Sequence, residues 1–253
     1  GVWRVLKFGG SSVGSPEKLS QVVRRSVAET RRLESSREGP SRLAIVVSAS
    51  GDTTDWLIDA ADFAAAGRLD DAKRMMEDIE RLAVTNGLAA HASTTADAAA
   101  PYGERLKAVV RDMLGPLRQL LLGISLLREK TPQALDTVLS FGERLSAAVL
   151  VGLLEEAGVP SVLVDARSWV TTDVGFGHAK VDWPTSRCKL LALRPAWGER
   201  AVPVVTGFIG RTPDGRTTTL GRNGSDYTAT MLGAALRAES VTINTDSYGV
   251  MTA

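Results

Sequence analysis

The sequence predicts an α/β domain with a large helical insertion. Short β-branched runs alternate with amphipathic segments of helical period, which is the order of strands and helices in α/β proteins. Glycines and hydroxyl residues follow several of these runs, as they do at the ligand-binding edge of a parallel sheet. The chain has 253 residues, of which 44% are apolar, and this is enough to bury one sizeable core.

Five apolar runs are expected to form strands. They lie at residues 2–8, 43–48, 161–165, 201–208 and 240–245. Pro213, Asp214 and Gly215 have the composition of a tight turn. We expect this turn to join two strands of a hairpin that leads to Leu220.

Helical periodicity dominates the first half of the chain. We expect a first helix from Pro16 to about Glu34, and further helices within residues 70–86, 103–122 and 135–157. No convincing strand occurs in about 54–146, so this range is predicted to be a helical insertion or lid. Residues 94–101 are expected to form a loop. A last helix is predicted over 227–236, with Ser225 or Asp226 as its N-cap.

Residues 217–226, with the sequence TTTLGRNGSD, predict a phosphate-binding turn. Gly221 and Gly224 allow a sharp turn in which backbone N–H groups approach an anion closely. Arg222 adds a permanent, fork-shaped positive charge. The N-terminus of the following helix would point at the same anion.

A second glycine turn follows the first predicted strand. Lys7 lies in this strand, and Gly9, Gly10, Ser11 and Ser12 come directly after it. Lysine, glycines and hydroxyls predict a nucleotide-phosphate cradle, although an ordinary turn between strand and helix fits the same pattern. It differs from the P-loop, in which the lysine follows the glycines.

Composition favours a soluble, cytoplasmic protein that binds neither nucleic acid nor a membrane. The formal net charge is +1, with Lys and Arg scattered among Asp and Glu. Cys188 is the only cysteine, which fits a reducing compartment. His91 and His178 are too few for a His/Cys metal site, so we predict no protein-held metal and place both at the surface or in loops. Any metal should be Mg²⁺, held mostly by nucleotide phosphates.

The sequence resembles the aspartate kinases of the amino-acid kinase superfamily in four motifs and in their order. The motifs are KFGGSSV at 7–13, VSAS at 47–50, SFGERLS at 140–146 and LGRNGSDY at 220–227. Residues 121–127, LLGISLL, further resemble the kinase half of bifunctional aspartokinase–homoserine dehydrogenases. The resemblance implies a three-layer αβα sandwich with a mostly parallel central sheet. It also implies ATP-dependent phosphorylation of the side-chain carboxylate of L-aspartate to 4-phospho-L-aspartate, the first step toward lysine, threonine and methionine.

The resemblance also implies the roles of individual residues. Lys7 and Asp226 would be catalytic: Lys7 would stabilise the transferred phosphoryl group, and Asp226 would orient Lys7 or Mg²⁺. The residues implied to bind aspartate are Ser48, Thr54, Glu143, Phe176, Arg222, Asn223, Gly224 and Ser225. The residues implied to bind the nucleotide are Lys7, Gly9, Gly10, Ser11, Thr245, Asp246, Gly249 and Val250.

Three of these charged residues could instead have a purely structural role. Lys7 could extend from a strand end into solvent. Arg222, implied to hold a substrate carboxylate, could instead pair with Asp226 in the turn. Glu143, expected at the start of a helix and implied to bind the substrate ammonium, could be a solvated acid that favours the helix dipole. No general base is needed, because the attacking carboxylate is already ionised.

The sequence departs from the family pattern at its end. The later lysine-containing segment near the nucleotide, the ACT regulatory domains and a dehydrogenase domain are not found within residues 1–253. We therefore expect one kinase domain that lacks the C-terminal part of the fold, binds aspartate better than ATP, and is a homo-oligomer or is completed by a partner segment. The alternatives are a kinase for another amino acid or carboxylate, or a non-catalytic binding subunit.

Overall fold

Parallel strands form the centre of the molecule. The computed structural model describes residues 2–35, 42–95 and 99–244. The strands are β1 (Trp3–Phe8), β2 (Arg42–Val47), β3 (Ser161–Val164), β4 (Val202–Thr206), β5 (Ile209–Arg211), β6 (Thr217–Thr219) and β7 (Ser240–Asn244). Five of them pair in parallel in the order β3-β4-β2-β1-β7, and β5 and β6 form the expected antiparallel hairpin. All five predicted strands are confirmed, with small shifts at their ends.

Seven α-helices and three short 3-10 helices occur in the described residues. The α-helices are α1 (Pro16–Glu34), α2 (Thr53–Ala65), α3 (Leu69–Thr94), α4 (Ala99–Leu127), α5 (Pro132–Glu156), α6 (Trp183–Leu193) and α7 (Gly224–Leu236). The 3-10 helices are η1 (Gly10–Val13), η2 (Ala166–Ser168) and η3 (Arg194–Trp197). The first predicted helix matches α1, whose N-cap Ser15 accepts a hydrogen bond from the backbone of Lys18.

Some predicted helix ends are wrong. Helix α4 already begins at Ala99, inside the predicted loop. Helix α5 begins at Pro132, because the Thr131 hydroxyl caps it and proline suits the first helical position. Helix α7 begins at Gly224 with Asn223 as its N-cap, so neither Ser225 nor Asp226 has the predicted capping role.

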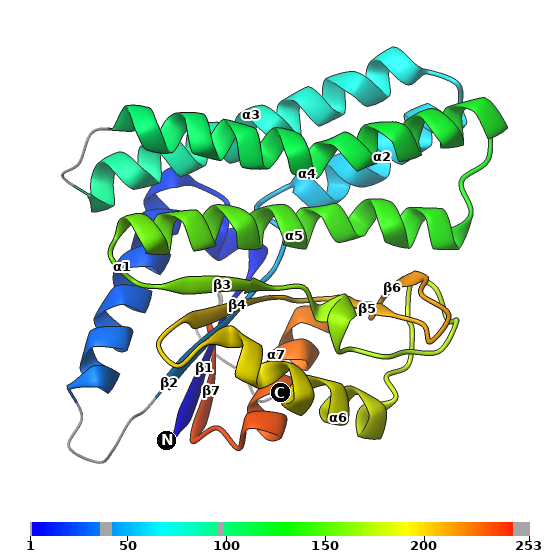
Figure 1. The fold of residues 1–253 in the computed structure, drawn as a ribbon. Helices are drawn as coiled ribbons and strands as arrows, with labels where there is room; N and C mark the ends of the chain where they lie inside the picture. The colour runs from blue at the N-terminus through cyan, green and yellow to red at the C-terminus, as the bar shows by residue number, and fades with distance from the viewer. Residues whose placement is uncertain (1, 36–41, 96–98, 245–253) are drawn as a thin grey trace, which may run out of the picture.

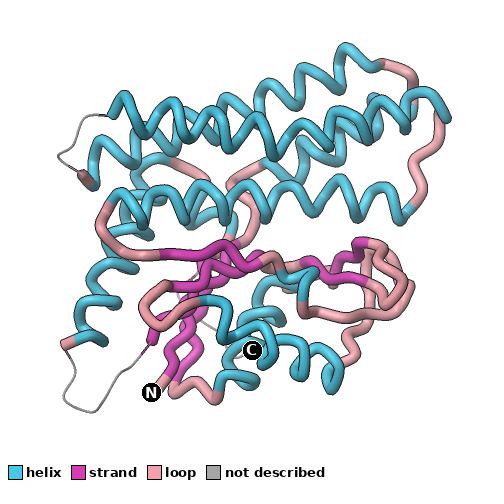
Figure 2. The backbone as a smooth tube through the Cα atoms, in the orientation of Figure 1, coloured by secondary structure: helices cyan, strands magenta, loops and turns pink. Residues whose placement is uncertain are grey.

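Helices cover both faces of the central sheet, as the three-layer prediction requires (Figures 1 and 2). Side chains of β1 alternate between two apolar cores: Leu6 and Phe8 pack with α1 and the α2–α5 helices, whereas Trp3 and Val5 pack with α6 and α7. Figure 1 shows α5 directly against the sheet and α2, α3 and α4 beyond it. From Thr53 to Glu156, every described element is a helix, which matches the predicted helical insertion.

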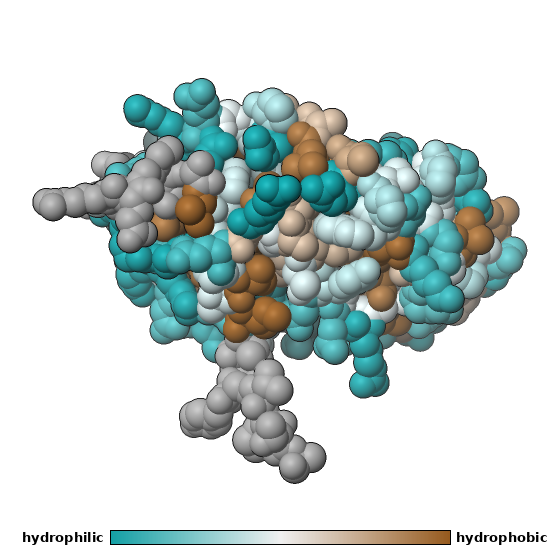
Figure 3. All heavy atoms as spheres, turned by 90° about the horizontal axis from the view of Figure 1, so that it is seen from below, coloured by the Kyte–Doolittle hydropathy of each residue, from teal (hydrophilic) through white to brown (hydrophobic). Residues whose placement is uncertain are grey.

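Helix α5 is the one described helix that is long and apolar enough to cross a membrane by length and composition. Of its most apolar stretch, 61% is buried inside the fold, which is the pattern of a core helix. Figure 3 shows the molecule from below the view of Figure 1. On this face, apolar side chains form several small patches between polar areas.

The prediction for His91 is wrong, whereas His178 is exposed as expected. His91 is fully buried in α3, where its ring stacks on Tyr102 of α4 with the ring centroids 4.5 Å apart. Its Nε2 lies 3.3 Å from a carboxylate oxygen of Glu156 in α5. Contacts from two other helices, α4 and α5, therefore hold a side chain that no local sequence pattern marks as buried.

Candidate active site

A cavity of about 230 Å³ opens at the carboxyl ends of β1 and β2, facing the start of α7. Its lining residues are Lys7, Ser48, Thr54, Glu143, Phe208, Gly221, Asn223, Gly224, Ser225 and Asp226. The sequence motifs from both ends of the chain thus meet around one space. The carboxyl edge of a parallel sheet is the usual position of a ligand site in this class of fold.

Lys7 is nearly buried and forms an ion pair with one acidic side chain among the described residues. It occupies the second-last position of β1, and its Nζ lies 2.6 Å from Oδ1 of Asp226 in the first turn of α7. Only 8% of Lys7 is exposed, so its side chain does not extend into solvent. Among the described residues no ion pair joins Arg222 to Asp226, whose ion pair is with Lys7, so the alternative of an Arg222–Asp226 pair is wrong.

The N-terminus of α7 reaches the cavity through a close approach between two backbones. A Cβ atom on Gly207, which follows β4, would lie 2.6 Å from Cβ and 2.9 Å from Cα of Ser225. Gly207 therefore lets the first turn of α7 lie directly against the end of β4. The first N–H groups of a helix have no intrahelical acceptor, and here they border the cavity next to Lys7.

Glu143 is in the middle of α5, not at the start of a helix as predicted. It is 4% exposed, and its Oε1 accepts a 3.3 Å hydrogen bond from the Ala49 backbone N–H. Its Oε2 is buried and has no hydrogen-bond partner among the described residues. Burial raises the pKa of Glu143 to about 8. The alternative, in which Glu143 is a solvated acid, is therefore wrong. Glu143 is a buried acid that lines the cavity, and its Oε2 has no partner among the described residues.

The glycine turn after β1 lies beside Lys7 but does not line the cavity. The Cβ position of Gly9 is 3.5 Å from Lys7 Nζ. A Cβ on Gly10 would lie 2.6 Å from the Ala49 carbonyl oxygen, so a side chain there would push apart the turns that follow β1 and β2. Gly10 also accepts a hydrogen bond from the Gly51 N–H, and Ser11 is exposed.

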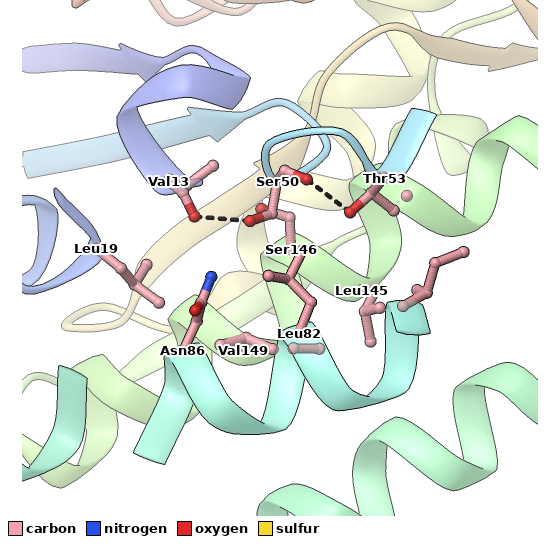
Figure 4. Close-up of a pocket in the computed structure, with 12 residues that line it drawn as sticks. Val13, Leu19, Ser50, Thr53, Leu82, Asn86, Leu145, Ser146 and Val149 are labelled. Carbon is pink, nitrogen blue, oxygen red and sulfur yellow. Dashed lines mark hydrogen bonds between the residues drawn. The ribbon is translucent and has the colours of Figure 1, made fainter. Parts of the chain in front are cut away.

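Both turns are anchored around a small internal cavity of about 20 Å³, which has room for one water molecule (Figure 4). The Ser50 hydroxyl donates to the Val13 carbonyl at 2.7 Å, and the Thr53 hydroxyl donates to the Ser50 carbonyl at 2.6 Å. From α3, the Asn86 amide donates to the Gly14 carbonyl at 3.3 Å. The helical insertion thus contacts both turns. Thr54, which is implied to bind aspartate, lies in the first turn of α2 and lines the larger cavity.

Some predicted site residues are not brought into the cavity. Arg222 is exposed, and no described residue forms an ion pair with it. Phe176 lies under the Arg216 guanidinium, 5.5 Å from the ring centroid, in a loop that borders the Gly221 turn. Thr245, Asp246, Gly249 and Val250 lie outside the described residues.

Two residues of this region were missed by the sequence analysis. Phe208 lines the cavity and has a positive φ of 67°, which is strained for a bulky residue. Asp136 is 1% exposed in α5 and accepts hydrogen bonds from the Gly177 loop and from the end of β6, both beside the cavity. A signal for Asp136 exists in the sequence: it is the single acid within the apolar stretch that precedes the SFGERLS motif.

Comparison with known proteins defines the family. The model of the amino acid kinase family matches residues 3–253, and the chain belongs to this family. Within it, the chain is similar to aspartokinases. It is 34% identical over 256 residues to the chloroplastic aspartokinase 1 of Arabidopsis thaliana, covering 100% of this chain and 41% of that protein.

Aspartokinase structures confirm the fold and the resemblance. The chain matches E. coli aspartokinase III in complex with aspartate and ADP with a TM-score of 0.79 and 28% identity, over 97% of this chain and 49% of that chain. It is also 28% identical over 258 residues to the chloroplastic bifunctional aspartokinase/homoserine dehydrogenase 1 of Arabidopsis thaliana, covering 99% of this chain and 26% of that protein. The chain spans less than half the length of each of these relatives.

Proposed function

We propose that this chain carries the catalytic domain of an ATP-dependent kinase that phosphorylates the side-chain carboxylate of L-aspartate. The observation that carries the proposal is Glu143, whose buried carboxylate has an oxygen without a partner and lines the same cavity as Lys7. A buried acid in this state is costly unless a cation joins it. The ammonium group of an amino acid supplies such a cation, and the relative crystallised with aspartate and ADP supports this choice.

The charges around the cavity fit phosphoryl transfer to a carboxylate. Both reactants are anionic, so the site needs fixed positive charge where the γ-phosphoryl group passes. Lys7, the first amides of α7 and the glycine turn beside Lys7 supply it. An oxygen of the aspartate side chain attacks the γ-phosphorus, the bond to the bridging oxygen breaks, and ADP leaves. No proton needs to be removed from the attacking group.

Mg²⁺ fits this site as a companion of the nucleotide. In the described residues, no group of three or more His, Cys, Asp or Glu side chains could hold a metal ion. Asp226 is the carboxylate next to Lys7 that could contribute one ligand, with ATP phosphates supplying the others. When bound, Mg²⁺ neutralises phosphate charge that would otherwise repel the substrate carboxylate.

We further propose that residues 1–253 form one kinase domain, with 54–146 as its helical subregion. Arg222, at the edge of the cavity, would grip a substrate carboxylate with its fork-shaped guanidinium. Three further properties remain predictions from the sequence: homo-oligomer formation, completion by a partner segment and a cytoplasmic location.

A substrate series tests the function. ADP release is measured with L-aspartate, L-glutamate, N-acetyl-L-glutamate and N-acetyl-L-aspartate, and acyl phosphate is trapped with hydroxylamine as a hydroxamate. We expect turnover and hydroxamate with L-aspartate alone, because N-acetyl-L-aspartate keeps both carboxylates but lacks the ammonium that Glu143 requires. Turnover with another member of the series would reassign the substrate. Aspartate binding without turnover would make the chain a binding subunit.

A further inference from the structure

The structure assigns Asp136 as a positioning residue that fixes the Gly221 turn, which lines the cavity, and the Phe176 loop that packs beside this turn. This inference rests on the proposed function for its substrate, but its structural part stands on hydrogen bonds that can be measured without any ligand. Asp136 lies on α5, seven residues before Glu143. Residues at this spacing share one helix face, about 10 Å apart along the axis.

The Asp136 carboxylate joins two segments that are distant in sequence. Its Oδ2 accepts from the Gly177 N–H and from the Thr219 N–H, each at 2.9 Å. Its Oδ1 accepts from the Thr219 hydroxyl, also at 2.9 Å. No described residue forms a salt bridge with Asp136, so these three donors are its compensation for burial.

One of these segments continues directly to the cavity, and the other packs against it. Thr219 ends β6, and Gly221, two residues later, lines the cavity. Gly177 follows Phe176, and the Gly177 carbonyl lies 3.3 Å from the Cβ position of Gly221. The Ala179 N–H donates to the Thr219 carbonyl at 2.9 Å, so loop and strand also hold each other.

Helix α5 therefore contributes to the site twice. Glu143 offers a carboxylate to the ligand, and Asp136 sets the distance from α5 to the Phe176 loop and to the turn that carries Arg222. Without Asp136, two buried backbone N–H groups and a hydroxyl would lose their acceptor. The Phe176 loop and the Gly221 turn would then be free to move away from α5.

The variants Asp136→Ala and Asp136→Asn test this assignment. The asparagine carbonyl can accept both backbone bonds, and its NH₂ group can donate to the Thr219 hydroxyl, so it should rescue what alanine loses. We expect amide hydrogen exchange at Gly177 and Thr219 to rise by about tenfold or more in Asp136→Ala and to stay near the parent rate in Asp136→Asn. The KM for L-aspartate should rise about tenfold in Asp136→Ala, with the KM for ATP within about twofold.

Asp173→Ala is the matched control. Asp173 also accepts two backbone bonds in the same loop, from Gly175 and Lys180, but it is exposed and does not contact Thr219. We expect exchange at Thr219 and the KM for L-aspartate to stay near the parent values. If Asp136→Ala does not fold, Thr219→Val removes only the Oδ1 contact, and a smaller rise in the KM for L-aspartate alone is expected.

Unchanged exchange at Gly177 and Thr219 in a folded Asp136→Ala would overturn the assignment, as would equal increases in both KM values. If the parent protein does not use L-aspartate, the proposed function fails, and the exchange rates of the alanine and asparagine variants alone decide the role of Asp136.

Discussion

Lys7 and Glu143 both line the cavity, but they differ in whether their charged atoms already have a partner. Lys7 is held by Asp226 at 2.6 Å, whereas Oε2 of Glu143 has no partner among the described residues. The difference has a physical consequence: Lys7 is oriented before any ligand arrives, and Glu143 gains stabilisation only when a cation binds. Lys7 should therefore determine the rate, and Glu143 should determine binding and the response to pH.

Lys7→Ala should lower kcat at least about a hundredfold, because about 3 kcal/mol of charge stabilisation in the transition state is lost. The thermal midpoint should change little, because the side chain of the remaining partner, Asp226, is 34% exposed and can be hydrated when Lys7 is removed. Steady-state ADP release and thermal melting measure the two effects. Lys180→Ala, at an exposed lysine outside the cavity, is the control and should keep kcat.

Glu143→Gln should change how stability depends on pH. Burial raises the pKa of Glu143 from 4.5 to about 8, so the folded state keeps a proton that the unfolded state releases above pH 4.5. The contribution of Glu143 to stability is thus fully present below pH 4.5 and is lost as pH rises through 8, by on the order of 5 kcal/mol.

Thermal melting of parent and Glu143→Gln from pH 5 to 9 checks this. The difference in midpoint, variant minus parent, should grow in favour of the variant up to about pH 8 and then level off. A difference that does not depend on pH would show that Glu143 ionises normally. Calorimetry should also show aspartate affinity lost in the variant, by about 2–5 kcal/mol.

At the scale of helices and strands, the ends of strands and the starts of helices position the residues of the site. Some of these ends can be predicted from the sequence, and others cannot. The strands, α1 and the hairpin follow from local apolar period and turn residues, so they were predictable. The start of α7 was placed too late because Asn223 in left-handed conformation (φ 57°) ends the turn, and sequence does not show backbone dihedrals. The burial of His91 depends on Tyr102 and Glu156 from other helices, and local windows do not report such contacts.

Gly207→Ala tests the close approach of β4 and α7. The new methyl group would overlap Ser225 and displace the first turn of α7, at a cost of about 1–3 kcal/mol in unfolding free energy. The ion pair of Lys7 with Asp226 lies on the same turn, so kcat should fall as well. Denaturant unfolding and ADP release measure both.

Gly123→Ala is its matched control. Gly123 lies inside α4 and is followed by Ile124, and a Cβ there meets no atom within 4 Å. Alanine should stabilise the helix by about 0.5–1 kcal/mol and leave kcat unchanged. If both alanine variants had the same stability, close packing at Gly207 would not be the reason for its glycine.

At the scale of the whole molecule, two apolar cores share one sheet. The helical insertion packs into the core that includes Leu6 and Phe8, whereas α6 and α7 complete the core that includes Trp3 and Val5. Because neighbouring residues of β1 pack into different cores, unfolding of the sheet would expose apolar side chains of both cores to water. The helical insertion should therefore not unfold separately from the rest.

Equilibrium unfolding in urea should show one transition by two probes. Tryptophan fluorescence reports mainly on the second core, where Trp3, Trp169 and Trp197 are buried. Far-UV circular dichroism reports mainly on helices, most of which pack in the first core. The two curves should coincide. A helical signal lost at lower urea than fluorescence would mean that the insertion is an independent unit.

The pairing of β1 with β7 also bears on the order of events during folding. The Asn244 side chain donates to the Lys7 carbonyl across 237 positions of sequence, and the two strands run side by side. Closing so long a loop is slow, because the entropy of the intervening chain is lost before the contact is gained. A nascent chain would therefore build its local helices early, whereas the meeting of Lys7 with the start of α7 waits for residues that are made much later than Lys7. Ligand capture should be among the last properties that a refolding molecule acquires.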